Sequence, residues 1–124
     1  MIRKFTHTFH VAGALSADLN IRFTAPTNCT LQHVSVVGSN ANDAEIKIGT
    51  SADDDGFLEL KDIGEQNVPI TFSRADFDGA LLSDPGNEFP RIRAGDVVVV
   101  TLIYGDVKGT AADDVTLVLT FLEG

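Results

Sequence analysis

The sequence predicts an all-β protein: an antiparallel β-sandwich with jelly-roll-like connections, about eight strands and at most one short helical turn. Two long runs, 97–104 and 115–122, consist almost entirely of apolar residues and threonine, which is typical of strands. Residues 4–11 and 19–23 alternate apolar and polar side chains, the period of a half-buried strand. Turn residues separate these segments at short intervals, as in sandwiches and unlike βαβ folds.

The expected strands follow one another along the chain with turn chemistry between them. Pro69 makes its strand an edge strand or places the proline at the strand's start, because proline has no N–H to donate to a ladder. In chain order, strands are expected at residues 4–11, 19–23, 31–37, 45–48, 68–72, 89–93, 97–104 and 115–122.

Two segments depart from simple alternation. In the third expected strand, Val34 and Val36 should lie on the face opposite Leu31. Between the fourth and fifth strands, the three-residue spacing of Leu60 and Ile63, with charged residues between them, favours one helical turn over an edge strand.

The last two runs are the expected centre of the fold. One short connection rich in Gly, Asp and Ala separates them, so they should pair directly as a β-hairpin. The first run is apolar at both odd and even positions, which indicates a strand covered on both faces. Because an isolated hairpin is unstable in water, the rest of the chain should cover it.

Length and charge narrow the class of protein. The 124 residues should form one domain spanning 1–124, large enough for a core without disulfides. Eighteen acidic against nine basic residues give a net charge of −9, so neither nucleic acid nor a membrane is expected as a partner. The single cysteine, Cys29, should be a small buried apolar residue. No signal peptide is visible, which predicts synthesis in a cytoplasm.

Residues 51–62 nearly match a twelve-residue calcium loop, which places oxygen ligands at positions one, three, five and twelve and glycine at six. The side-chain ligands would be Ser51, Asp53, Asp55 and Asp62. The first position is Ser where the motif has Asp, and an Asp at the twelfth is too short for the usual bidentate Glu contact. The alternative, a solvated acidic turn, is therefore favoured.

The sequence offers little for catalysis. No serine lies in a nucleophile-elbow context, and no Gly-rich phosphate loop precedes a helix. Acidic residues pair only as neighbours in loops, which does not place two carboxylates across a cleft. His7 and His10 fall on opposite faces of a strand, so they do not converge on one metal ion. The sequence predicts no enzyme and, calcium apart, no cofactor.

Several stretches, taken in order, resemble small β-sandwich virion proteins of tailed bacteriophages, of the capsid decoration (cement) or head and tail fibre type. The resemblance covers nearly the whole chain and implies no catalytic residues. The stretches are 21–26 (IRFTAP), 30–35 (TLQHVS), 75–77 (ADF), 94–99 (AGDVVV) and 114–119 (DVTLVL).

This resemblance implies a non-enzymatic virion structural protein, most simply a decoration protein that binds and stabilises the capsid exterior. It implies a symmetric oligomer, often a homotrimer, bound to the major capsid protein or another virion protein. The virion would be its location after synthesis in the host cytoplasm. The alternative is a fibre-type or carbohydrate-binding β-sandwich module that recognises a host surface glycan.

Two basic spots stand out in this acidic sequence: Arg3 with Lys4, and Arg91 with Arg93. Opposite charges across an interface steer and orient the encounter of two proteins. We therefore expect these four residues to contact an acidic capsid shell or a neighbouring subunit. The alternative is that they are ordinary solvated charges.

Overall fold

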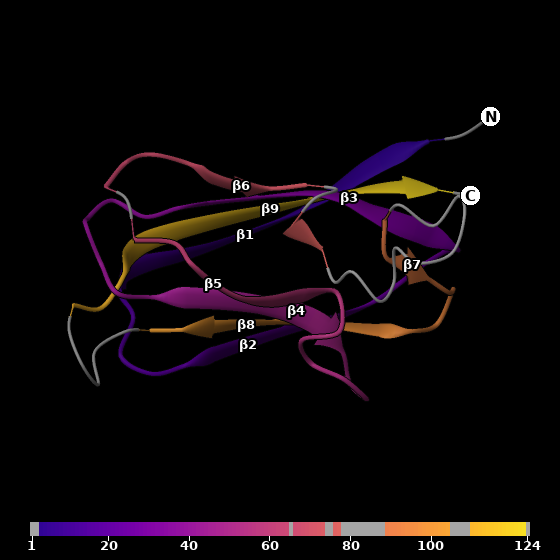
Figure 1. Ribbon diagram of the computed structural model, residues 1–124, viewed down its shortest axis with the longest axis horizontal. Helices are drawn as coiled ribbons and strands as arrows, with labels where there is room; N and C mark the ends of the chain where they lie inside the picture. The colour runs from indigo at the N-terminus through magenta and orange to yellow at the C-terminus, as the bar shows by residue number, and fades with distance from the viewer. Residues whose placement is uncertain (1–2, 65, 74–75, 78–88, 105–109, 124) are drawn as a thin grey trace.

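The computed structural model describes the chain except for residues 1–2, 65, 74–75, 78–88, 105–109 and 124. The described residues form nine β-strands in two layers (Figure 1). None of their helices has the length and hydropathy needed to cross a bilayer. The strands are β1 (Lys4–Ala14), β2 (Leu19–Thr24), β3 (Cys29–Val37), β4 (Glu45–Thr50), β5 (Leu58–Asp62), β6 (Ile70–Phe72), β7 (Arg91–Ile92), β8 (Val97–Ile103) and β9 (Asp113–Glu123).

The strand order is that of a jelly roll. One sheet, the β9 sheet, has the order β1-β9-β3-β6, with β7 also paired to β3. The other, the β8 sheet, has the order β2-β8-β4-β5. Every pairing between these strands is antiparallel, and the chain crosses repeatedly from one sheet to the other. The predicted fold class is confirmed.

The inner faces of the two sheets form one hydrophobic core. Leu117, Leu119 and Phe121 of β9 are fully buried, as are Val98 and Val100 of β8. The residues between them on β9 are half-buried, so this strand turns one face to the core. Burial of each such side chain contributes roughly 1.5–3 kcal/mol, which makes this core the main source of stability.

The predicted hairpin between the last two strands is wrong. β8 lies between β2 and β4 in one sheet, and β9 lies between β1 and β3 in the other. Both long edges of each strand are therefore already hydrogen-bonded to other strands. A strongly apolar strand buries the most surface in the centre of a sheet. β8 and β9 each take such a position, so the connection between them joins two different layers.

β8 is covered on both faces, as predicted. Val99 and Thr101, on the face away from the core, are only 3% and 7% exposed. The Thr101 hydroxyl donates a hydrogen bond to Asn20 Oδ1 at 2.9 Å. Val99 pairs with Gly49, and the turn after β4 folds back so closely that a Cβ on Gly49 would overlap the backbone oxygen of Asp53. Gly49 is thus the position that lets this turn lie against the sheet.

A β-bulge corrects the prediction for β3. Leu31, Val34 and Val36 all lie on the core side and are fully buried. The pairing of β3 with β9 shifts between Leu31 and His33, where β3 carries one extra residue. Such a residue reverses the alternation beyond it, so two segments of opposite phase face the same core.

The helical turn that the spacing favoured between the fourth and fifth expected strands is wrong, and the segment is a strand with a second bulge. This segment is the edge strand β5, and its pairing with β4 shifts between the partners of Ile46 and Ile48. The extra residue lies in β5, because Ile46 pairs with Lys61 and Ile48 with Leu58. Leu60 and Ile63 do not share a face as they would in a helical turn, because Leu60 is 44% exposed while Ile63 is fully buried.

Asp114 fastens the end of β1 to the start of β9. Its carboxylate accepts hydrogen bonds from the Gly13 N–H at 2.8 Å and from the Ser39 hydroxyl at 3.0 Å. These two hydrogen bonds, and the nearby charge of His10, lower the pKa of the Asp114 carboxyl. Asp114 also has a positive φ of 47°, a conformation that Asp and Asn tolerate better than most residues.

Replacing Gly49→Ala should lower the free energy of unfolding by about 2 kcal/mol, because the new methyl group displaces the backbone of the following turn. Urea denaturation measures the loss. The matched control is Ser51→Ala, an exposed position on the same turn, which should leave stability unchanged. Equal stabilities for the two variants would contradict the close approach described above.

The Asp114 carboxylate should stabilise the fold only while it is ionised. Because its folded-state pKa is lowered, its contribution is complete above the unfolded pKa of about 4 and is lost as the pH falls through the lower folded value. Urea unfolding from pH 6 to pH 2.5 should therefore show a smaller loss for Asp114→Asn, which cannot titrate, than for the natural chain. Parallel curves for the two chains would remove this role.

Candidate functional site

The four cations noted in the sequence lie at one end of the molecule, although the chain carries them in two places. Lys4 pairs with Leu122, Leu122 with Thr30, and Thr30 with Arg91. These residues form one row across four strands spaced about 4.8 Å apart, which places Lys4 and Arg91 about 14 Å from each other along the row. Both are exposed. Figure 1 shows the start of β1, the end of β9 and β7 at this end.

Arg3 and Arg93 flank this row. The Arg3 carbonyl accepts a hydrogen bond from the Glu123 N–H at 2.7 Å, and the Arg93 N–H donates to Asp96 Oδ2 at 3.0 Å. These contacts use the backbone of each arginine, and both residues are exposed. We call the set Arg3, Lys4, Arg91 and Arg93 the basic end.

The cations of the basic end form no ion pair with a described carboxylate and are available to bind a partner. Among the residues that the structure describes, the one ion pair joins Lys47 to Asp54 at 3.0 Å. No described carboxylate is therefore paired with a cation of the basic end. In a chain with a net charge of −9, a local cluster of unpaired cations orients the molecule toward a negatively charged surface.

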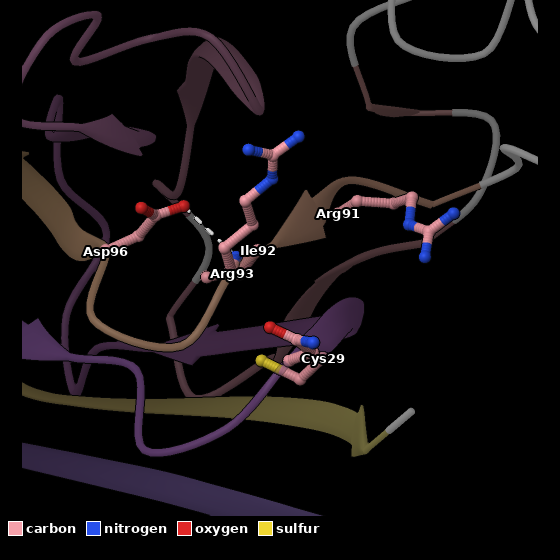
Figure 2. A pocket seen from close by; sticks show the side chains of 6 residues that line it. Cys29, Arg91, Ile92, Arg93 and Asp96 are labelled. Atoms are coloured by element: carbon pink, nitrogen blue, oxygen red, sulfur yellow. Dashed lines mark hydrogen bonds between the residues drawn. The ribbon is translucent and has the colours of Figure 1, made fainter.

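A hollow of about 510 Å³ opens at this end (Figure 2). In Figure 2 the side chains of Arg91 and Arg93 project in different directions from the β7 segment, and the Cys29 thiol lies below them. Asn28 Oδ1 accepts a hydrogen bond from the Ala94 N–H at 2.9 Å, which ties together the two turns that border the hollow. Its lining residues are Asn28, Cys29, Arg91, Ile92, Arg93 and Asp96.

Cys29 does not act as a nucleophile here. Its residue is 2% exposed, and burial raises the pKa of its thiol, as does the negative charge of Glu123. A protonated thiol is a weak nucleophile and a weak metal ligand. Cys29 is therefore a buried packing residue, as the sequence predicted.

The chemistry that the hollow offers is recognition of an anion. Arginine binds carboxylates through paired hydrogen bonds of fixed geometry, and two arginines line the opening. Asp96 supplies the one carboxylate among the lining residues, and its Oδ2 accepts a backbone hydrogen bond. The described lining residues therefore offer no facing pair of carboxylates for general acid and base catalysis.

The structure brings together only part of the predicted calcium loop. The carboxylates of Asp53, Asp54 and Asp55 lie within 4.8 Å of one another on the exposed turn after β4. Asp62 is at the far end of β5, where it pairs with Glu45. A five-residue strand spans about 13 Å, so Asp62 is separated from the other proposed ligands. Ser51 lies exposed at the start of the turn.

The carboxylates of this acidic turn repel one another. A hydrogen bond with Asp53 raises the pKa of Asp55, and the charges of Asp53 and Asp54 raise it further, while Lys47 acts in the opposite direction. The turn is fully solvated, and exposed acidic groups of this kind are common without an ion. Both alternatives for the turn therefore remain predictions.

No protein-family model matches the chain, and no curated protein sequence matches it. A solved structure does match in fold. A chain of the cyanophage Pam1 capsid asymmetric unit superimposes with a TM-score of 0.51 at 7% identity, covering 99% of this chain and 85% of that one. This protein shares its fold with that capsid chain. The expected resemblance to bacteriophage β-sandwich virion proteins is thereby confirmed for the fold.

A weaker match is with a chain from the structure of the infectious bursal disease virus Gx strain. Its TM-score is 0.39 and its sequence identity 10%, covering 99% of this chain and 33% of that one. That score is too low to indicate a shared fold.

Sequence reasoning did not identify Asn28 and Asp96 as part of a site. Each lies in a turn, after β2 and after β7 respectively. Thr24, at the end of β2, pairs with Val97, at the start of β8, so the two turns must adjoin. The pairing of two strands, which the local pattern does not specify, was the missing information.

If the acidic turn binds calcium, Asp53 and Asp55 should carry the binding. A solvated loop with few ligands gives a Kd of about 10⁻⁴–10⁻³ M, measurable by titration calorimetry. The double variant Asp53→Asn with Asp55→Asn should abolish the signal, and Asp62→Asn should keep it because β5 separates the two positions. If the natural chain gives no heat of binding at millimolar calcium, the turn does not bind calcium and the alternative of a solvated acidic turn holds.

Proposed function

We propose that this protein is a non-enzymatic structural component of a bacteriophage virion, located on the capsid exterior. The observation that carries the proposal is the jelly-roll fold shared over 99% of the chain with a chain of the cyanophage Pam1 capsid asymmetric unit. The match covers nearly the whole of this chain and 85% of the other, so the two chains share a whole domain and not a fragment. The family resemblance in the sequence points in the same direction.

In this proposal the protein is a decoration (cement) protein that reinforces the capsid lattice. Its partner is the major capsid protein or another virion protein, and it reaches the particle after synthesis in the host cytoplasm. It binds as a symmetric oligomer, for which the family resemblance implies three copies. Its acidic exterior keeps it dispersed until it docks, because like charges oppose non-specific association.

The basic end is the proposed docking surface. Its four cations are exposed and unpaired with described carboxylates, and Arg91 and Arg93 border a hollow. An acidic segment of the capsid shell would enter this hollow and form charge-assisted hydrogen bonds with the two guanidinium groups. Outside these four of the nine basic residues, the chain has five basic and eighteen acidic residues, so the basic end is the part of the surface best suited to such a shell.

The absence of catalysis is also part of the proposal. The buried thiol at the hollow is held protonated, and the described lining residues include one carboxylate and no histidine. Such a set binds anions but has no partner groups for proton transfer.

Reversing two charges of the basic end tests the docking surface. The variant Arg91→Glu with Arg93→Glu should weaken binding to undecorated capsids on the order of tenfold to a hundredfold, because two attractive contacts become repulsive. Co-sedimentation with capsids measures the bound fraction, and binding of the natural chain should fall as salt is raised.

The matched control is Arg22→Glu, compared with the single variant Arg91→Glu because each changes the net charge by two. Arg22 is an exposed cation on β2 of the other sheet, so its reversal changes the net charge without touching the basic end. Equal losses for Arg22→Glu and Arg91→Glu would reduce the effect to net charge and remove the proposed surface. A glycan array separates the carbohydrate-binding alternative, since a decoration protein should give no sugar signal with or without a chelator.

A further inference from the structure

β1 is a long edge strand whose middle carries no protection against pairing, since its bulge lies beyond Val11 and its one lysine is Lys4 at the start. It has eleven residues and pairs only with β9 among the strands of its sheet. From Phe5 to Val11 it contains no Asp, Glu, Lys, Arg or Pro, the residues that most often prevent edges from joining another chain. The neighbouring edge strand β2 differs, because it carries the exposed Arg22 near its middle.

The hydrogen-bond pattern shows which backbone groups of β1 are free. The Glu123 N–H donates to the Arg3 carbonyl at 2.7 Å, and these residues are opposite each other one step beyond the pair of Lys4 and Leu122. Opposite residues that share such a bond recur at every second position of an antiparallel ladder. The odd-numbered residues of β1 therefore bond to β9. The N–H and C=O groups of Lys4, Thr6, Thr8 and His10 point to the open edge.

The sequence of β1 is symmetric about its middle. Residues 5–9 read Phe-Thr-His-Thr-Phe, which is identical in both directions around His7. In a two-fold pairing, residue i of one copy contacts residue j of the other and j contacts i, so this symmetric stretch places Thr opposite Thr and Phe opposite Phe. We propose that two copies of this protein associate by antiparallel pairing of their β1 strands, centred on His7.

This register satisfies the free backbone groups. Thr6 of one copy lies opposite Thr8 of the second, and Lys4 lies opposite His10, so all the outward-pointing groups find partners in about eight hydrogen bonds. His7 lies opposite its own counterpart in a pair without hydrogen bonds, where the Cα atoms approach to about 4.5 Å. A register shifted by one residue would also shift each side chain to the wrong face.

The side chains of the inner face support the same contact. Phe5, His7 and Phe9 are half-buried in the single chain. The rings of His7 and Phe23 lie 4.2 Å apart, and Phe5 stacks on Phe121 at 5.1 Å. In the pair, Phe5 of one copy lies opposite Phe9 of the second. Cross-strand aromatic pairs of this kind stabilise a sheet, and they cover the aromatic surface that one copy leaves open.

This contact goes beyond the proposed function and is tested without any capsid. Because its symmetry is two-fold, it adds copies in pairs. Alone it yields a dimer, and between two trimers it yields a hexamer.

The first test is Thr8→Pro, measured by size exclusion with light scattering. Proline removes the outward N–H of residue 8 without removing a bond to β9, so the fold should persist in circular dichroism. The natural chain should have twice the 13.2 kDa mass of one chain, or a higher even multiple. The proline variant should have half the mass of the natural assembly. Thr8→Ala is the matched control, since it keeps the N–H and should keep the assembly.

The second test is a cysteine pair that needs no proline. Under oxidation, His7→Cys should form a covalent dimer, because two residues at the two-fold axis lie within disulfide range. Thr8→Cys should not, because its two copies are offset by two residues, about 7 Å along the strand. Cys29 is buried in both variants.

Three results would overturn the pairing: a natural chain that is a monomer or an odd-numbered oligomer, a folded Thr8→Pro variant with an unchanged mass, and equal cross-linking of the two cysteine variants. If Thr8→Pro fails to fold, the cross-linking pattern alone decides.

Discussion

Burial of apolar side chains between two stacked sheets is the constraint on which the rest of this structure depends. Phe121 illustrates it: the ring is fully buried, stacks on Phe5 of its own sheet and meets Phe23 of the other sheet edge-on at 5.5 Å. Every strand has one face committed to this layer. Since a one-residue slip would turn that face outward, the core fixes the register of each strand.

The same layer explains why the charged groups gather at the ends and edges of the molecule. The jelly-roll path crosses between the sheets, so most turns lie beyond the core, where polar and charged residues remain solvated. Arg93, Asp96 and Asn28 belong to two such turns that hydrogen bonds hold at one end. The acidic turn after β4 lies at this same end, because the Ser51 N–H donates a hydrogen bond to the Val97 carbonyl, next to Asp96. The turns at the end of the sandwich thus carry groups of both charges outside the core.

The edge strands β1 and β2, one in each sheet, illustrate a conflict between solubility and assembly. A free edge that carries a charge, as β2 does with Arg22, resists unintended pairing. A long uncharged edge with half-buried aromatic residues, as in β1, promotes unwanted pairing in a monomer. In a protein that assembles with copies of itself, the same edge supports the assembly. For a chain with a net charge of −9, a local uncharged edge also avoids the repulsion that other parts of the surface would produce.

The sequence by itself determined the fold class and nearly every strand, because alternation, β-branched runs and turn residues are local signals. Val97–Ile103 and Asp113–Glu123 were evident as strands, and the buried character of Cys29 followed from its type. Only the tertiary structure decided that these two strands occupy different sheets and that bulges reverse the phase of β3 and β5. It also decided that Lys4 and Arg91 share one row while Asp62 stands apart from Asp53. These outcomes depend on which strands become neighbours. The neighbours are set by the joint burial of apolar side chains from all the strands, which no local sequence pattern specifies.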